Sequence, residues 1–99
     1  MRGWDAEIHR LRGELTGRLP YSDPAEAEDS FRTALAIARE QGTRGYELRA
    51  AVSLARLRRD QGRRTEARDL LAPVYGWFTE GFDTPDLKEA KALLDELDA

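Results

Sequence analysis

The sequence predicts an all-α fold in which helices pair as antiparallel hairpins. Apolar residues recur at spacings of three and four through most of the chain, and no five-residue stretch alternates with the period of two that marks strands. A second observation is a pattern that occurs twice, with an alanine at a fixed place. Its two copies read Ala27, Phe31, Ala34, Leu35, Ala38 and Ala67, Leu70, Leu71, Val74, Phe78. Small residues at fixed places in paired helices let two backbones come close, as in helical repeats.

The first helix is expected over residues 5–16, and its apolar side is a single stripe. This stripe consists of Trp4, Ile8, Leu11 and Leu15. Gly17 and Pro20 come next, and both residue types commonly end helices.

The second helix, expected over 23–41, has the clearest start signal in the chain. Asp23 can accept a hydrogen bond as the cap, Pro24 has the fixed φ of a first helical residue, and Glu26 follows the cap as in a capping box. Gly42 is suited to the left-handed conformation that ends a helix.

The third helix is expected over 45–61, beginning at Arg44 or Gly45 and ending before Gly62. It is apolar on two sides, which predicts a helix packed between neighbours. One side carries Leu48, Ala51 and Ala55, and the other carries Ala50, Leu54 and Leu57.

The fourth and fifth helices are expected over 64–79 and 84–97. Pro73 falls inside the fourth, where we expect a bend and a continued helix, because the apolar stripe continues beyond it. Pro85 lies in the first turn of the fifth, after a cap at Asp83 or Thr84. The apolar stripe of the fifth helix is Leu87, Ala90, Leu94 and Leu97, with Leu93 beside it. A last helix with one apolar face and an acidic back is suited to capping a helical array.

These patterns resemble tetratricopeptide repeats. The matching residues are Leu54, Ala55, Gln61, Gly62, Glu66, Ala67, Leu71 and Val74, and Ala27, Phe31 and Ala34 repeat the second-helix part. The 40 residues from Ala27 to Ala67 exceed the usual repeat of about 34, so the resemblance implies a divergent variety with long helices. The whole chain, including segment 75–82, is similar to the C-terminal repeat region of large bacterial signalling ATPases and adenylate cyclase-type regulators. That resemblance implies a region that senses or assembles, and none of the family's catalytic or nucleotide-binding motifs occurs here.

Length and composition indicate one domain, 1–99, in a reducing compartment. The 99 residues include no cysteine, which excludes disulfides and thiolate metal sites. No apolar run approaches the ~20 residues of a membrane span, and residues 1–20 do not have the apolar run that a signal peptide needs. We therefore expect a cytoplasmic protein without a membrane partner, and the resemblance implies a bacterial one.

Charge is unevenly distributed and suggests a binding groove. Residues 44–68 carry a net charge of +5 and residues 69–99 a net charge of −6. By the repeat alignment, the third helix would line a groove with Arg49, Val52, Arg56 and Arg59, and the first helix would add Glu7, Arg10 and Glu14. Guanidinium groups bind carboxylates in pairs of hydrogen bonds, so an acidic protein or peptide is the expected partner. The alternative is a solvated charged face with no ligand.

Other functions find less support in the sequence. The net charge of −3 and the lack of a recognition-helix motif argue against nucleic acid. His9 is the only histidine, so we expect no metal site, and the carboxylates lie on polar helix faces, so we expect neither catalytic residues nor a cofactor.

Two further surfaces are candidates for contacts. Tyr75 and Trp77 cannot both share the face of Phe78, so one of them is expected on another surface as a contact anchor. The first helix has no preceding repeat to cover its apolar edge, and the oppositely charged blocks could also pair between copies. The sequence therefore predicts a non-enzymatic protein–protein interaction module, with self-association as the alternative.

Overall fold

The computed structural model describes residues 5–19, 23–78 and 84–98, and within these ranges it contains helices and no strand. The helices are α1 (Asp5–Arg18), α2 (Pro24–Gln41), α3 (Arg44–Asp60), α4 (Arg64–Gly76) and α5 (Pro85–Asp98). The predicted all-α hairpin fold is thereby confirmed. Expectations that concern Trp4, Pro20, Thr79 and Asp83 lie outside the described residues.

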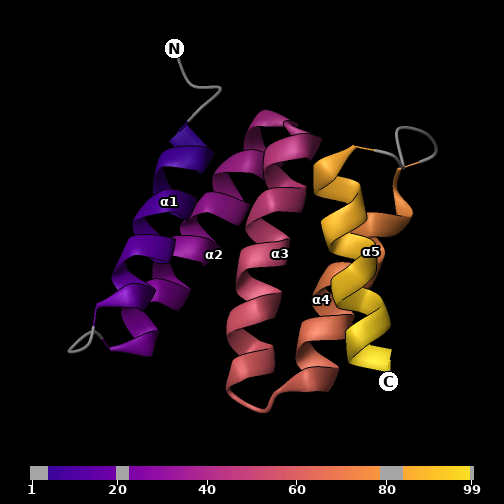
Figure 1. Cartoon of the computed structure of the whole chain (residues 1–99). Helices are drawn as coiled ribbons and strands as arrows, with labels where there is room; N and C mark the ends of the chain where they lie inside the picture. Colours follow the sequence, from indigo (N-terminus) through magenta and orange to yellow (C-terminus); the bar gives the residue numbers. More distant parts are fainter. Residues whose placement is uncertain (1–4, 20–22, 79–83, 99) are drawn as a thin grey trace.

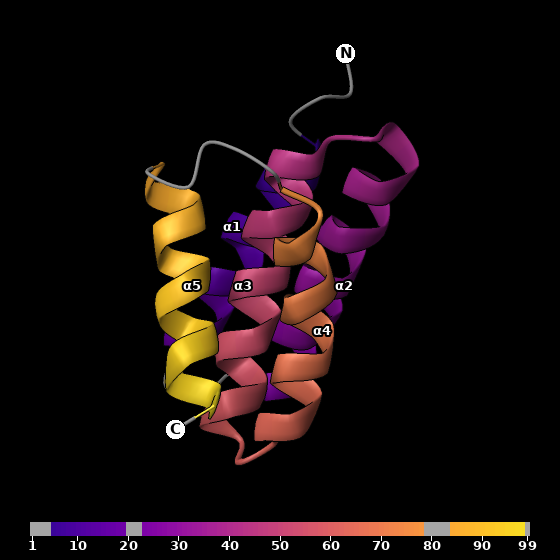
Figure 2. The same ribbon diagram turned by 90° about the vertical axis from the view of Figure 1, so that its right-hand side faces the viewer.

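The five helices form two layers, and successive helices run antiparallel (Figure 1). α1, α3 and α5 lie side by side in one layer, while α2 and α4 form the other (Figure 2). α3 contacts all four of the other helices. Its position explains why its sequence is apolar on two sides.

The ends of α2 and α3 follow the predicted local signals. The Asp23 carboxylate accepts a hydrogen bond from the Ala25 N–H at 2.9 Å, and Pro24 is the first helical residue. Gly42 has φ +70° and Gly62 has φ +79°. Only glycine adopts this left-handed conformation without a steric penalty, so each helix ends where a glycine permits the chain to reverse.

α4 is shorter than predicted. It continues past Pro73 but ends at Gly76, so the expectation of a helix to residue 79 is wrong at Trp77 and Phe78. The Trp77 N–H donates to the Val74 carbonyl at 3.3 Å and the Phe78 N–H donates to the Tyr75 carbonyl at 3.2 Å. These tight i→i−3 bonds, next to a glycine that weakens helices, close the last turn.

The main core lies between α3, α4 and α5, with α2 adding to it. Its largest fully buried side chains include Leu48, Leu71 and Val74. On α5, Leu93 is buried and Leu94 is only partly buried. The prediction, which placed Leu94 in the apolar stripe and Leu93 beside it, was wrong for these two neighbours. Ala27, Phe31 and Leu54 form a second, smaller cluster where α1, α2 and α3 meet.

Candidate functional site

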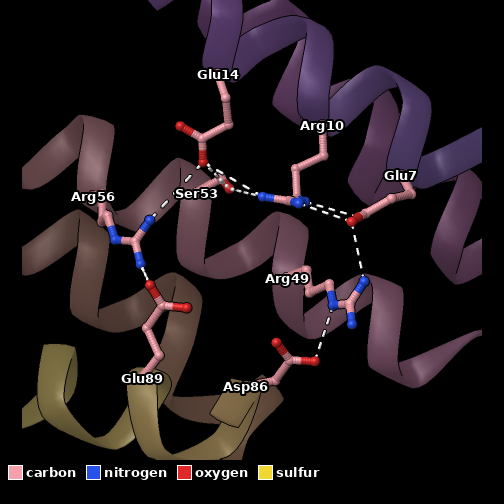
Figure 3. A network of polar contacts seen from close by, with 8 residues as sticks. All are labelled: Glu7, Arg10, Glu14, Arg49, Ser53, Arg56, Asp86 and Glu89. Carbon is pink, nitrogen blue, oxygen red and sulfur yellow. Dashed lines mark hydrogen bonds and ion pairs between the residues drawn. The ribbon is translucent and has the colours of Figure 1, made fainter.

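The predicted groove residues, except Arg59, come together on the layer of α1, α3 and α5, and Figure 3 shows the charged ones. They surround a recess of about 170 Å³, which we call the charged recess. Its lining comprises Arg10, Leu48, Arg49, Val52, Ser53, Arg56, Asp86 and Glu89. Val52 is buried in its floor, while Glu7 and Glu14 of α1 contact its arginines.

One half of the charged recess is a chain of ion pairs from α1 to α5. Arg10 donates two hydrogen bonds of 2.8 Å to the Glu7 carboxylate, one from Nε and one from Nη2. Arg49 donates from Nη1 to Glu7 at 3.0 Å and from Nε to Asp86 at 2.9 Å. Arg49 of α3 thus bridges carboxylates of both neighbouring helices.

The other half is centred on Glu14, whose carboxylate accepts a hydrogen bond from one residue and forms ion pairs with two others. The buried Ser53 hydroxyl donates to it at 2.8 Å, and the guanidinium groups of Arg10 and Arg56 lie 3.5 and 3.9 Å away. Arg56 also forms an ion pair with Glu89 of α5. Arg56 therefore has carboxylates on both sides, as Figure 3 shows.

The charged recess is electrostatically balanced within the chain. The hydrogen bond from Arg10 lowers the pKa of Glu7, and the charges of Arg10 and Arg49 act in the same direction against the effect of burial. The hydrogen bond to Asp86 likewise raises the pKa of Arg49. An acidic ligand would have to displace carboxylates that already hold these arginines.

Arg59 lies further along α3 and does not line the recess. It donates to Glu96 of α5 at 3.0 Å and to Asp60 at 3.1 Å. Arg68 of α4 pairs with Asp98 at 2.9 Å. The basic middle block and the acidic C-terminal block, which the sequence analysis paired between copies, thus pair with each other inside one chain.

Sequence reasoning missed the carboxylates that occupy the recess. The signal was present as spacing: positions 86, 89 and 96 are acidic on α5, and positions 49, 56 and 59 are basic on α3. Two helices that run in the same direction side by side bring such rows together. The adjacency of α3 and α5, which lie on either side of α4 in sequence, had to be known first.

A second surface is the outer side of α1, where four large apolar side chains form what we call the apolar row. Ile8, Leu11, Leu15 and Leu19 are 52%, 47%, 63% and 62% exposed. α1 packs inward through its small residues instead, with Ala6 and Gly13 buried. The described residues of the predicted stripe, Ile8, Leu11 and Leu15, therefore lie on the face that α1 leaves uncovered.

The two candidate aromatic residues separate as expected. Tyr75 and Phe78 pack against the core, while Trp77 is 45% exposed. The guanidinium of Arg44 lies 5.8 Å from the centroid of the Trp77 ring. This cation–π contact holds one side of the indole against the start of α3.

Two kinds of site are absent from the described ranges. There, no cluster of three or more histidine, aspartate or glutamate side chains is placed to bind a metal ion. No helix of these ranges combines the length and the apolar character of a membrane span.

Comparison with known proteins gives no relative to argue from. No model of a protein family matches the chain, and no curated protein or solved structure shows significant similarity to it. The functional argument therefore depends on the surfaces described above.

Proposed function

We propose that the chain is a non-enzymatic protein–protein interaction module, built from tetratricopeptide-like helix hairpins. The observation that carries this proposal is the apolar row of α1. Isolated exposed leucines are common, but a contiguous row of three on α1 and a fourth, Leu19, directly after it is typical of a surface that another protein covers.

A second copy of the chain is the partner that the apolar row fits best. Among the described residues, the only other large apolar side chain that is strongly exposed is Trp77. The exposed positions of α5 are mostly charged, so a head-to-tail stack would place the row against a polar surface. A two-fold pair that brings one row against the other avoids this mismatch.

The expected association is weak. Covering a half-exposed leucine or isoleucine contributes about 1 kcal/mol. A two-fold pair covers eight such side chains, and the resulting gain is comparable to the ~4–15 kcal/mol cost of association. Self-association is therefore expected only at about millimolar concentrations or above.

The charged recess is a second candidate surface for a partner. Its floor includes Leu48 and Val52, and its rim presents both guanidinium and carboxylate groups. This composition favours a segment with both charges over a purely acidic one, because the arginines already have carboxylate partners.

Sedimentation equilibrium tests the apolar row directly. We expect the wild type to approach the mass of a dimer as concentration rises, and the variant Leu11→Gln/Leu15→Gln to stay monomeric. Ala72→Gln on the exposed side of α4 is the matched control and should behave as the wild type. A monomeric wild type at all concentrations would show that a second copy is not the partner.

A photo-cross-linking side chain then tests for a different protein partner. It is placed at Leu15, with Ala72 as the control position, and the protein is expressed in cells. A discrete adduct formed at Leu15 and not at Ala72, identified by mass spectrometry, would support the interaction module. The absence of any adduct, together with a monomeric wild type, would contradict it.

A further inference from the structure

A second recess lies between α2, α3 and α4, away from the predicted groove. It has a volume of about 220 Å³. We call it the arginine recess, because three arginines surround three leucines there: Arg32, Arg39, Arg58, Leu35, Leu54 and Leu70. The arginines come from two helices. Arg32 and Arg39 are seven residues apart on α2 and therefore lie on the same face of it, and Arg58 belongs to α3.

The arginine recess differs from the charged recess in having no carboxylate in its lining. Arg39 donates from Nε to the buried Glu47 at 2.8 Å, and Arg32 lies 3.5 Å from Glu28. Both side chains are more than half exposed, so parts of their guanidinium groups remain accessible.

Arg58 is the residue that sets this site apart. Within the described part of the chain, its side chain forms no hydrogen bond or close ion pair, although its charge helps to lower the pKa of Glu66, and its Nε is buried without an acceptor. A buried donor that lacks an acceptor is unfavourable, and a carboxylate in the recess would satisfy it once the Arg58 side chain turns toward the recess. The recess thus has guanidinium groups and no carboxylate in its lining, together with an unused donor.

We propose that the arginine recess binds a carboxylate of an acidic peptide segment, with an apolar neighbour of that carboxylate on the leucines. The assignment to a peptide rests on the proposed function of the chain as a protein-binding module. The volume agrees with this, because pockets for whole small molecules span about 300–1,000 Å³, and this recess is smaller. One or two side chains of a segment fit such a space, and the guanidinium fork supplies paired hydrogen bonds to the carboxylate.

The site can be tested by NMR on the full ¹⁵N-labelled chain, through its backbone and arginine Nε–H signals. The probe is a blocked seven-residue peptide of alternating glutamate and leucine. The same peptide with glutamine in place of glutamate removes the charge, and hexanoate presents the carboxylate and the apolar group without a peptide. Arg58→Met and Arg32→Gln remove one guanidinium each, and Arg56→Gln in the charged recess is the matched control.

We expect the glutamate peptide to shift the Arg58 signal and to bind about tenfold more weakly to Arg58→Met, with Arg56→Gln unchanged. Arg32→Gln, at a more exposed position, should weaken binding in the same direction and guards against misfolding of the Arg58 variant. Equal binding of the glutamine peptide, or unchanged affinity in both recess variants, would overturn the proposal. Equal affinity for hexanoate would overturn the peptide assignment.

The two proposals fail separately. If Arg56→Gln weakens binding of the peptide and Arg58→Met does not, the acidic segment binds in the charged recess. The arginine recess is then ruled out as its site, while the proposal of an interaction module still stands. Sedimentation of the Arg58→Met variant should match the wild type, because the apolar row lies on α1.

Discussion

Gly13 of α1 lies against the ring of Phe31 in α2, and no larger residue fits there. A Cβ at Gly13 would stand 2.6 Å from Cε1 and 2.8 Å from Cδ1 of Phe31, which is itself buried. Real Cβ atoms do not approach other atoms so closely. This one contact allows α1 to pack through its small residues and leaves its large apolar side chains on the outside.

Gly13→Ala should destabilise the fold, although alanine is the better helix former. Overpacking a buried site costs about 1–3 kcal/mol, and the gain in helix propensity offsets only about 1 kcal/mol of it. We expect a net loss near 1 kcal/mol in urea unfolding. Phe31→Leu should relieve the clash, so the double variant should lose less stability than the sum of the single ones.

Gly17→Ala is the matched control on the same helix. A Cβ there would lie 3.9 Å from Ala27 Cβ, an ordinary contact. This substitution should therefore stabilise the protein by up to about 1 kcal/mol. If Gly13→Ala and Gly17→Ala stabilise the protein equally, Gly13 and Phe31 do not lie in close contact in solution.

The sequence predicted the helices well, because the signals for their ends are local. Asp23, Pro24, Gly42 and Gly62 act through their own backbone or through neighbours two to five residues away. The direction of the α1 stripe was different, since periodicity shows that one face is apolar but not what that face contacts. The only sign in the sequence was Gly13 itself. A glycine inside a helix often marks a close packing contact, and Gly13 lies on the side of α1 opposite the apolar stripe.

The charged recess illustrates a second limit of the sequence. Arg49 meets a carboxylate 37 positions away in the chain, and no local pattern encodes that contact. The arginines were correctly placed on one side of α3, but their availability to a ligand depended on Asp86 and Glu89 of another helix.

Replacing Arg56 with glutamate should lower stability as well as affect binding. The new carboxylate would lie between Glu14 and Glu89, and like charges at this partly exposed site cost about 1 kcal/mol. Combining Arg56→Glu with Glu89→Arg should recover part of the loss. Urea unfolding of the four proteins gives the coupling energy, expected at about 0.5–1 kcal/mol.

Additive effects in that cycle would mean that Arg56 and Glu89 do not interact in solution. A positive coupling has a practical consequence for binding studies. A charge reversal at Arg56 alone mixes a loss of stability with a loss of partner, so the double exchange is the better test of the charged recess.

Stability should depend on the ionisation of Glu7. Its pKa is lowered in the folded protein from the ordinary value of 4.5, mainly by the hydrogen bond from Arg10. A carboxylate with a depressed folded pKa stabilises the protein above its unfolded pKa, and this contribution is lost as the pH falls through the folded value. The wild type should exceed Glu7→Gln by about 1 kcal/mol at pH 7, and the two should converge well below pH 4.5.

Glu40→Gln is the control for that pH series, because it changes the net charge equally. Glu40 is exposed, and the described part of the chain gives it no ion pair. Its variant should follow the wild type at every pH. A constant difference between the wild type and Glu7→Gln from pH 7 to pH 3 would contradict the role of the Glu7 carboxylate.

Pro73 is expected to reduce the stability of α4, and its replacement should therefore stabilise the protein. Alanine at this exposed position supplies an N–H to the Asp69 carbonyl and removes the crowding by the ring, worth ~3 kcal/mol in an ideal helix. The greater freedom of the unfolded chain offsets about 1 kcal/mol of that. We expect Pro73→Ala to raise stability by about 1–2 kcal/mol and Tm by roughly 4–8 °C per kcal/mol.

Pro24→Ala is the matched control, because a first helical residue needs no N–H partner and its fixed φ already fits the helix. It should leave Tm unchanged or slightly lower, and a fall in Tm for Pro73→Ala would show that the proline ring stabilises the end of α4 through contacts of its own.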